Sequence, residues 1–247
     1  WPASLCANLR RLHWAAAQVR GRLSGENWLA LLELQRDMQA LDPARTDLGE
    51  ALDFLNRLVM SLAALSGFAL DDMTRDDGWR FLMIGRRIER VRFFAESIAA
   101  FLDGGSAWDA GALEWLLELG NSGITYRSRY LASPQLVPVL DLLLLHEQNP
   151  HSLRFQLQAL ERSLERLHEE FGAPRERELR TLGERLRSFD LAALESPLFG
   201  AAGLDEVLVG LARLLRDIAA CAGQVSDRLG LRYFAHVDDV SQRTVST

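Results

Sequence analysis

Lysine is absent from the sequence, so arginine supplies all 28 of its basic side chains. Codon bias in a GC-rich genome is sufficient to explain this, but the absence still excludes some chemistry. Without a lysine amine there is no Schiff base, no Walker-type phosphate anchor and no lysine-borne acyl carrier. The 34 acidic residues leave a net charge of −6. That charge argues against nucleic acid as a partner, because generic nucleic-acid binders need an excess of cations.

Cysteine and long apolar runs are scarce as well. The two cysteines, Cys6 and Cys221, are too few for a disulfide framework and lack the spacing of metal ligands. We therefore expect a reducing, cytoplasmic location. The longest uninterrupted apolar runs, such as Leu142–Leu145, are much shorter than a membrane-spanning helix. We accordingly expect no membrane partner.

Motifs of self-contained catalysis are missing from the sequence. It has no glycine-rich phosphate loop, no nucleophile elbow and no HExxH metal motif. Glu165-x-x-His168 has the spacing of half a carboxylate-bridged di-iron site, but no second Glu-x-x-His completes it. We predict neither a metal nor a cofactor, and the residues alone leave open whether the chain is an enzyme.

Helical periodicity runs through almost the whole sequence, in which leucine and alanine dominate and β-branched residues are sparse. The pattern predicts an all-α fold, a multi-helix bundle, in one domain over residues 1–235 with a polar tail at 236–247. Helices are expected at about residues 4–22, from 26 onward, 46–65, 79–102, 110–131, a short one ending at 145, 149–173, 176–187 and 204–229.

A weak internal echo suggests a degenerate duplication. The matching residues, at a constant offset of 148, are Pro2, Ser4, Leu5, Leu9 and Leu12 with Pro150, Ser152, Leu153, Leu157 and Leu160. Leucines match easily in a leucine-rich chain, so duplication and chance both stay open. Since the sequence starts at Trp1, we expect the upstream half of a first copy to be missing.

An ordinary surface helix has a polar face opposite its apolar seam. The expected helix at 79–102 instead carries apolar residues on both sides, with charged residues among them. Its apolar seam is Phe81, Ile84, Ile88, Val91, Ala95 and Ile98, and further apolar residues on the far side are Trp79, Met83, Phe93 and Phe94. A helix that is apolar nearly all round is usually buried, so Glu89, Arg86 and Arg90 are expected to be buried and paired. They form either an internal salt bridge that joins two helices or a polar binding site.

A second constellation combines hydroxyl, phenol and guanidinium groups on about one helical face. Its members are Ser122, Thr125, Tyr126, Arg127, Arg129 and Tyr130. Such a surface suits a polar or anionic ligand. The alternative is that the tyrosines pack and the arginines extend their charged ends to solvent.

A third constellation is the segment Asn149-Pro150-His151-Ser152. Asparagine is a preferred N-cap and proline fits the first helical position, so this segment predicts a helix start at Asn149. A helix N-terminus also attracts anions. His151 could join such a site, although a lone histidine beside a cap is usually only exposed.

Together these motifs resemble the bacterial alpha-E family, an all-helical family named for its Glu-Arg motif. The resemblance covers nearly the whole chain. It is carried by Met73-Thr74-Arg75-Asp76-Asp77-Gly78-Trp79-Arg80-Phe81, Gly85-Arg86-Arg87-Ile88-Glu89-Arg90, Thr125-Tyr126-Arg127-x-Arg129-Tyr130, Asn149-Pro150-x-Ser152-Leu153 and Arg20-x-Arg22-Leu23-Ser24-x-Glu26-x-Trp28.

The resemblance implies a biochemical context. Such domains occur beside, or fused behind, a circularly permuted ATP-grasp protein or domain, and transglutaminase-like proteins are frequent neighbours. The implied role is that of a helical companion in an ATP-grasp amide (peptide) ligase system, which binds a peptide or amino-acid substrate or the ligase itself. Glu89 would hold an amine, while Arg86, Arg90 and Arg129 would hold carboxylates or phosphates. The alternative is a non-catalytic interaction scaffold in which the Glu-Arg pairs are structural.

The sequence also departs from the family pattern. A second Glu-Arg helix near the family's start is absent, which agrees with a missing N-terminal part. The family usually has Arg where His151 stands, often Asp where His146 stands, and Asn where Trp1 precedes Pro2. These differences bear on anion binding at the two Pro-x-Ser loops.

Overall fold

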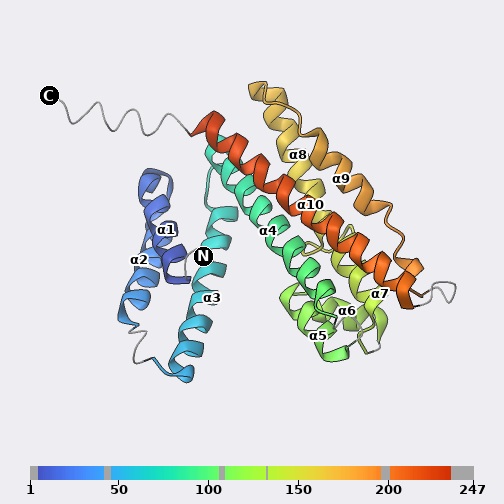
Figure 1. Cartoon of the computed structure of the whole chain (residues 1–247). Helices are drawn as coiled ribbons and strands as arrows, with labels where there is room; N and C mark the ends of the chain where they lie inside the picture. The colour runs from blue at the N-terminus through green and yellow to red at the C-terminus, as the bar shows by residue number, and fades with distance from the viewer. Residues whose placement is uncertain (1–4, 42–45, 106–108, 132, 196–200, 235–247) are drawn as a thin grey trace. The chain divides into compact units, whose positions relative to one another are not determined.

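The computed structural model describes residues 5–41, 46–105, 109–131, 133–195 and 201–234 (Figure 1). Ten α-helices and three shorter helical turns occupy this part of the chain, which contains no strand. The predicted all-α fold is therefore confirmed. The chain divides into two compact units, residues 1–80 and 81–247, each described below by itself. The expected polar tail at 236–247 lies outside the described residues.

Unit 1 contains the first three helices, and local caps explain where the second and third begin. The Ser24 hydroxyl caps the second helix by accepting from the Asn27 amide at 3.2 Å, and Asp47 with Glu50 forms a capping box on the third. The helices are α1 (Leu5–Gln18), α2 (Gly25–Ala40) and α3 (Leu48–Asp71), with a short 3₁₀ turn at Arg20–Arg22. Their small core consists of Leu9, Leu34, Met38, Phe54 and Leu58.

The third helix is longer than its sequence predicts. It continues through Gly67 to Asp71 instead of ending near residue 65, because one glycine inside a helix costs only about 1 kcal/mol relative to alanine. Counting uninterrupted runs also missed its length: Leu48–Asp71 is long and apolar enough, by length and composition only, to cross a membrane. Only 11% of this apolar stretch is buried, and one such helix is weak evidence of a membrane span, so the absence of a membrane partner stays a prediction.

Unit 2 is built around α4 (Asp77–Asp103). The first four residues of this helix, 77–80, are the last residues of unit 1. Its predicted seam is confirmed: Ile84, Ile88, Val91, Ala95 and Ile98 are all buried. The remaining helices are α5 (Ala110–Leu119), α6 (Gly123–Tyr130), α7 (Leu136–Leu140), α8 (Leu153–Phe171), α9 (Arg177–Arg187) and α10 (Ala201–Tyr233), with a π-helix at Asp141–Leu145 and a 3₁₀ turn at Leu191–Glu195. One large leucine-rich core joins them.

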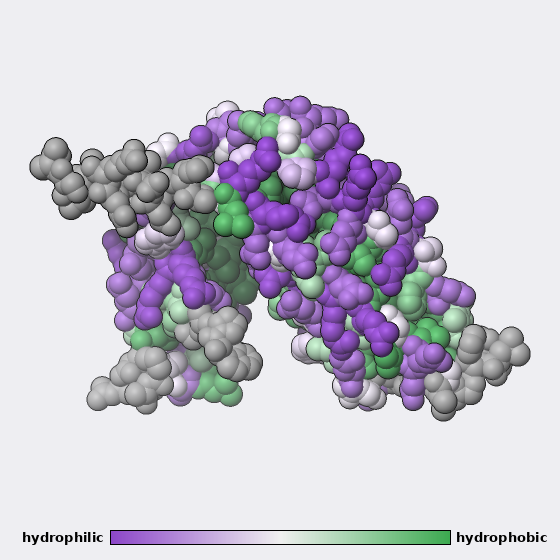
Figure 2. All heavy atoms as spheres, turned by 45° about the horizontal axis from the view of Figure 1, so that its top comes forward, coloured by the Kyte–Doolittle hydropathy of each residue, from purple (hydrophilic) through white to green (hydrophobic). Residues whose placement is uncertain are grey.

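The last helix lies antiparallel to α4 in this unit. Near one end the rings of Phe81 and Tyr233 are 5.0 Å apart, and towards the other end Arg216 forms an ion pair with Asp103. Figure 1 shows α10 running along α9 as well. The face of unit 2 in Figure 2 is mostly hydrophilic, with hydrophobic residues in strips between the polar ones. The contacts with α10 hold α4 in place, and the seam of α4 is buried in the core of unit 2.

The single helix expected at 110–131 is instead two helices, and the break is tightly packed. A Cβ on Gly120 would meet Leu143 Cδ2 at 2.7 Å and Phe94 Cζ at 3.0 Å, so this position needs glycine. The next residue, Asn121, has φ of 45°, a left-handed conformation that asparagine tolerates. The close approach and the turn together end α5 and restart the chain as α6.

The internal echo has a partial structural counterpart. Leu5 and Leu153, which the echo pairs, lie in α1 and α8. Each of these helices is followed by two more in the same order along the chain. Duplication stays a prediction, since similar helix order alone does not distinguish common origin from chance.

Candidate functional site

Three arginines of α4 gather on one side of the helix. Arg86 and Arg87 are half-buried and Arg90 is exposed. Among the described residues no carboxylate forms an ion pair with any of the three. Arg87 donates to Gln156 Oε1 at 3.4 Å, and its Nε atom is buried with no hydrogen-bond partner. Buried guanidinium groups are usually paired, so this arrangement is unusual.

Neighbouring positive charges make the charged forms of Arg86 and Arg87 less favourable. Burial lowers the pKa of Arg86, and the charge of Arg90 adds to that effect. Burial also lowers the pKa of Arg87, assisted by Arg162 of α8, Arg90 and Arg86. Every charge that shifts these two pKa values is thus another arginine. We call Arg86, Arg87, Arg90 and Arg162 the arginine cluster, and its mutual repulsion favours an anion beside it.

Glu89 does not lie where the sequence placed it. Its side chain is 71% exposed and pairs at 3.7 Å with Arg92, three residues later on the same helix. The expectations of a buried Glu89 and a buried Arg90 are wrong, and so is that of a salt bridge from Glu89 to a second helix. Residues 85 to 92 present their polar side chains away from the seam, and the helix is not apolar all round at this point. A role for Glu89 in holding an amine stays a prediction.

The turn before α8 is organised around the side chain of Asn149. This residue is 4% exposed. Its Nδ2 donates to Ser122 Oγ at 3.0 Å and to the Leu142 carbonyl at 3.1 Å, while its Oδ1 accepts from the His151 amide at 3.1 Å. The turn is therefore held rigidly against the α5–α6 junction. It brings the second and third constellations of the sequence together at Ser122.

The helix start predicted at Asn149 is three residues too early. Ser152 is the N-cap of α8: its Oγ accepts from the Phe155 amide at 3.1 Å and donates to the His146 carbonyl at 2.6 Å. Asparagine and serine are comparable caps. The tertiary bonds of Asn149 decide between them, because they hold that side chain inside the turn.

His151 stands next to the arginine cluster. Its Nε2 lies 3.3 Å from Asn121 Nδ2. An amide nitrogen can only donate, so Nε2 is the acceptor and the ring proton lies on Nδ1. Burial and the charge of Arg90 lower the pKa of His151. A neutral ring with a free Nδ1–H donor is the form that these neighbours favour at neutral pH.

A cavity of about 160 Å³ lies where α4, the α5–α6 junction and the start of α8 meet. We call it the Arg90 pocket. Its lining residues are Arg90, Phe93, Phe94, Leu119, Gly120, Pro150, His151, Leu153 and Gln156. Gln156 is already engaged, since its Nε2 donates to the Pro150 carbonyl at 2.5 Å. The pocket therefore combines apolar walls with the cationic Arg90 and the His151 ring.

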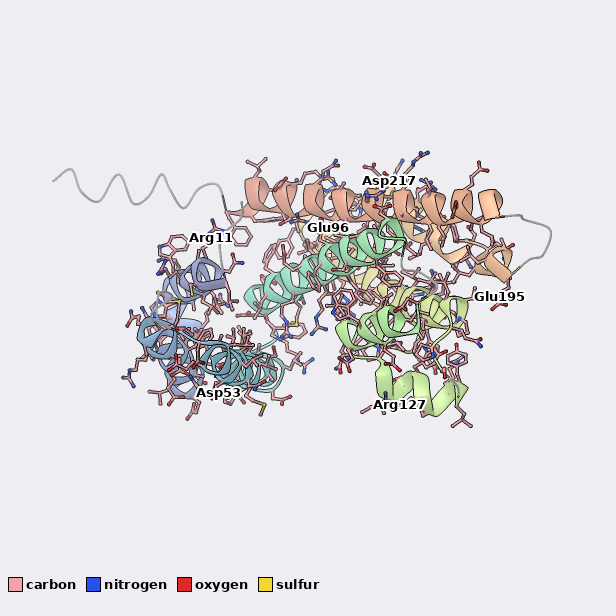
Figure 3. The ribbon with its side chains drawn as sticks, turned by 60° about the horizontal axis from the view of Figure 1, so that its bottom comes forward. Arg11, Asp53, Glu96, Arg127, Glu195 and Asp217 are labelled. Atoms are coloured by element: carbon pink, nitrogen blue, oxygen red, sulfur yellow. The ribbon has the colours of Figure 1, made fainter. Side chains whose placement is uncertain are left out.

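The tyrosine and arginine residues of α6 lie outside this pocket. Tyr126 is 1% exposed, and its hydroxyl accepts from the Gln135 amide and donates to the Ser133 carbonyl. Its interactions match the packing alternative for the second constellation. Arg127 is exposed at the periphery of unit 2 (Figure 3).

A polar network joins α6 to the π-helix. Tyr130 donates to Asp141 Oδ2 at 3.3 Å, and Arg129 lies 2.5 Å from His146 Nε2. Burial, followed by the charge of Asp141, raises the pKa of Tyr130. Arg129 and Tyr130 have partners within this network, while Nδ1 of His146 is buried with no hydrogen-bond partner among the described residues.

A larger cavity of about 330 Å³ lies near the end of α10. Its walls are mainly apolar, and its Arg228 is bonded to Glu176 at 2.5 Å. Its other arginine, Arg232, donates to the carbonyls of Phe171 and Gly172. Because Arg228 and Arg232 both have partners, this cavity is a weaker candidate for binding an anion than the Arg90 pocket.

Sequence reasoning missed several residues of the site. Arg87 lies inside the Gly85–Arg90 motif. The available signal was its closeness to Arg86 and Arg90 in the sequence. Gln156 interrupts the apolar stripe of α8, one turn after Ser152, and a buried polar residue there is a usable clue. Asn121 gave no signal, since only the tertiary fold brings it near His151, whereas Phe93 lies one turn after Arg90 on α4 and was identified only as an apolar residue of the far side.

The fold and the site define an all-helical domain with a mainly apolar pocket to which the Glu-Arg helix contributes Arg90. The chain belongs to the Alpha-E family, which it matches over residues 1–234 and which is described as a predicted alpha-helical domain with a conserved ER motif. Glu-Arg occurs at residues 89–90, 161–162, 165–166, 176–177 and 184–185 of the described chain, and the resemblance given above assigns the motif to Glu89-Arg90 on α4.

The chain is also similar to uncharacterized proteins of Mycobacterium bovis and of Mycobacterium tuberculosis strains CDC 1551 and H37Rv. Each is 31% identical over 227 residues, which is 88% of this chain and 26% of the relative. The chain thus spans about a quarter of the length of these relatives. No solved structure matches it significantly.

Proposed function

We propose that this domain is the helical companion of an ATP-grasp amide (peptide) ligase and binds the anionic end of a peptide or amino-acid substrate. One observation supports the anion: the arginine cluster has no carboxylate partner among the described residues and lies beside the Arg90 pocket. Charge-assisted bonds from guanidinium to carboxylate are among the strongest that proteins make.

The residues of the site would share the binding of the substrate. Arg90 and the His151 Nδ1–H would contact the carboxylate, and the charges of Arg86 and Arg87 would add to the local positive potential. Glu89, exposed one residue before Arg90, would hold the substrate amine outside the pocket. The partner would be a circularly permuted ATP-grasp protein or domain, which would supply the nucleotide chemistry, and a transglutaminase-like protein is a further candidate partner.

The test is product formation by the domain co-purified with the ATP-grasp protein, with products from candidate amino acids identified by mass spectrometry. Arg90→Gln should abolish product without lowering the melting temperature. Arg213→Gln is the matched control, because Arg213 is an exposed arginine of α10 away from the pocket. Equal product from both variants would remove the pocket from the proposed function.

A second candidate, a non-catalytic interaction scaffold, is favoured by a different observation. Arg87 bonds to Gln156, and Gln156 bonds to the Pro150 carbonyl, so this chain ties α4 to the turn before α8. A structural tie is what a scaffold requires of its arginines.

Glu89→Gln distinguishes the two candidates. Because Glu89 is exposed, the substitution should leave the melting temperature unchanged. A binding role predicts loss of product in the assembled system, whereas a scaffold predicts unchanged product.

A further inference from the structure

We propose, building on the function above, that the Arg90 pocket takes a carboxylate whose neighbouring carbon bears one compact apolar group. The ligand class is a hydrophobic amino acid with its carboxylate free, either alone or as the C-terminal residue of a peptide. The argument rests on the walls of the pocket, on its volume and on the placement of its donors.

The walls of the pocket are mostly apolar. Phe94 and Leu153 are buried in the core and form its inner surface, whereas Phe93 is 57% exposed and lies at its rim. Leu119 and Pro150 complete the apolar lining. A wholly polar ligand would leave these side chains without a favourable contact, and a hydrocarbon group would gain from removal of water.

The volume limits the size of that group. The cavity measures about 160 Å³, and an apolar cavity of about 150 Å³ is known to accommodate benzene. One phenylalanine or leucine side chain therefore fills it. A nucleotide or a stretch of several residues does not fit inside, so the rest of a longer ligand has to extend into solvent.

The donors lie at this same pocket. Arg90 has no ion-pair partner among the described residues, and His151 retains its Nδ1–H because its Nε2 faces Asn121. Gln156 is largely committed, since one Nε2 hydrogen is donated to the Pro150 carbonyl and its Oε1 accepts from Arg87, which leaves one amide hydrogen. Two donors suit one carboxylate, and the apolar walls place the hydrophobic group beside it.

Calorimetric titration of the whole chain tests this ligand class with four probes. These are N-acetyl-L-phenylalanine, its amide, N-acetylglycine and inorganic phosphate, at constant ionic strength. N-acetyl-L-phenylalanine should bind at least about tenfold more tightly than N-acetylglycine, because only the former buries a ring. It should also exceed its own amide by at least about tenfold, because only the acid accepts charge-assisted bonds.

Three variants locate the binding. Arg90→Gln should weaken the binding of N-acetyl-L-phenylalanine at least about tenfold. Phe93→Ala should also weaken its binding, while the affinity for N-acetylglycine should not change. Arg213→Gln, the matched surface control, should bind like the parent chain. Circular dichroism and melting temperature confirm that each variant is folded before its titration is interpreted.

The outcomes separate this inference from the proposed function. If N-acetylglycine or inorganic phosphate binds through Arg90 but the phenylalanine ring adds nothing, the hydrophobic ligand class is overturned and an anion site remains. If no anion binds, or if Arg90→Gln binds as the parent does, both proposals are overturned.

Discussion

Asn149 is the residue on which the geometry of the site most depends. Its amide joins the α5–α6 junction to the turn before α8, through Ser122 and the Leu142 carbonyl. Its side-chain oxygen, Oδ1, accepts a hydrogen bond from the backbone amide of His151. Because the amide is buried, removing it would leave several polar atoms without partners or water.

Asn149→Ala should therefore lower the free energy of unfolding of unit 2 by about 2–3 kcal/mol, since each unsatisfied buried group costs about 1–3 kcal/mol. Urea unfolding followed by circular dichroism measures the loss. Gln224→Ala, at an exposed position of α10, is the control and should change stability by less than about 0.5 kcal/mol. Equal effects of the two substitutions would show that Asn149 does not organise the turn.

His151 provides a pH-dependent prediction. Burial and Arg90 lower its pKa in the folded chain, so in the interval below about pH 6.5 the unfolded chain binds more protons than the folded one. Stability contributed by the neutral ring is thus present above the unfolded pKa and is lost as the pH falls below it. Between pH 7.5 and 5.5, His151→Gln should lose less stability than the parent chain in urea unfolding at each pH. Parallel losses would contradict the inferred environment of the ring.

At the residue scale, the sequence predicted the chemistry of the site better than its positions. Arg86 and Arg90 were identified, and they lie in the arginine cluster. Glu89 was expected inside and is exposed, because a helical wheel cannot tell which neighbours cover a flank. His151 was considered for an anion site at the helix N-terminus but not as a neighbour of Arg90, since that proximity arises from segments far apart in the chain.

At the scale of elements, α8 shows how tertiary contacts choose a helix start. Asn149 and Ser152 are both good caps, but Asn149 is committed to the α5–α6 junction, so the helix begins at Leu153. The Ser152 hydroxyl then has two functions, capping α8 and holding the His146 carbonyl.

Ser152→Ala should destabilise unit 2 by about 1–2 kcal/mol, because loss of a serine cap costs about 0.5–2 kcal/mol and the His146 carbonyl loses one of its two donors, keeping only the Asn149 amide. Thermal and urea unfolding measure the change. Thr181→Ala removes a hydroxyl that bonds back within α9 at an exposed position, and it should be nearly neutral. A neutral Ser152→Ala would indicate that the cap adds nothing to the turn.

Most helices were predictable from periodicity, and the exceptions have physical causes. The break between α5 and α6 depends on the approach of Leu143 and Phe94 to Gly120, which no local pattern contains. The π-helix Asp141–Leu145 likewise has no sequence signature that separates it from an α-helix. Helix boundaries set by local caps, as at Asp47, were predicted closely.

At the scale of the molecule, the two units differ in the size of their cores. Unit 1 buries a small cluster of five hydrophobic residues, while the core of unit 2 extends through α4, α8 and α10. The amount of buried apolar surface sets how readily a region opens.

Hydrogen exchange followed by mass spectrometry should therefore show faster exchange in α1–α3 than in α8 and α10. Each helix is compared at the same pH and temperature, with the unfolded chain as reference. Equal protection of the two units would contradict a weaker core in unit 1.

The most direct test of the central claim is an NMR titration of the isotopically labelled chain with N-acetylglycine against sodium chloride at equal ionic strength. If the Arg90 pocket binds carboxylates, the amide signals of Gly120, His151 and Gln156 should shift in a saturable way, and the shifts should vanish in Arg90→Gln. Shifts that are absent, that are spread over the surface or that persist in Arg90→Gln would contradict an anion site at the Glu-Arg helix.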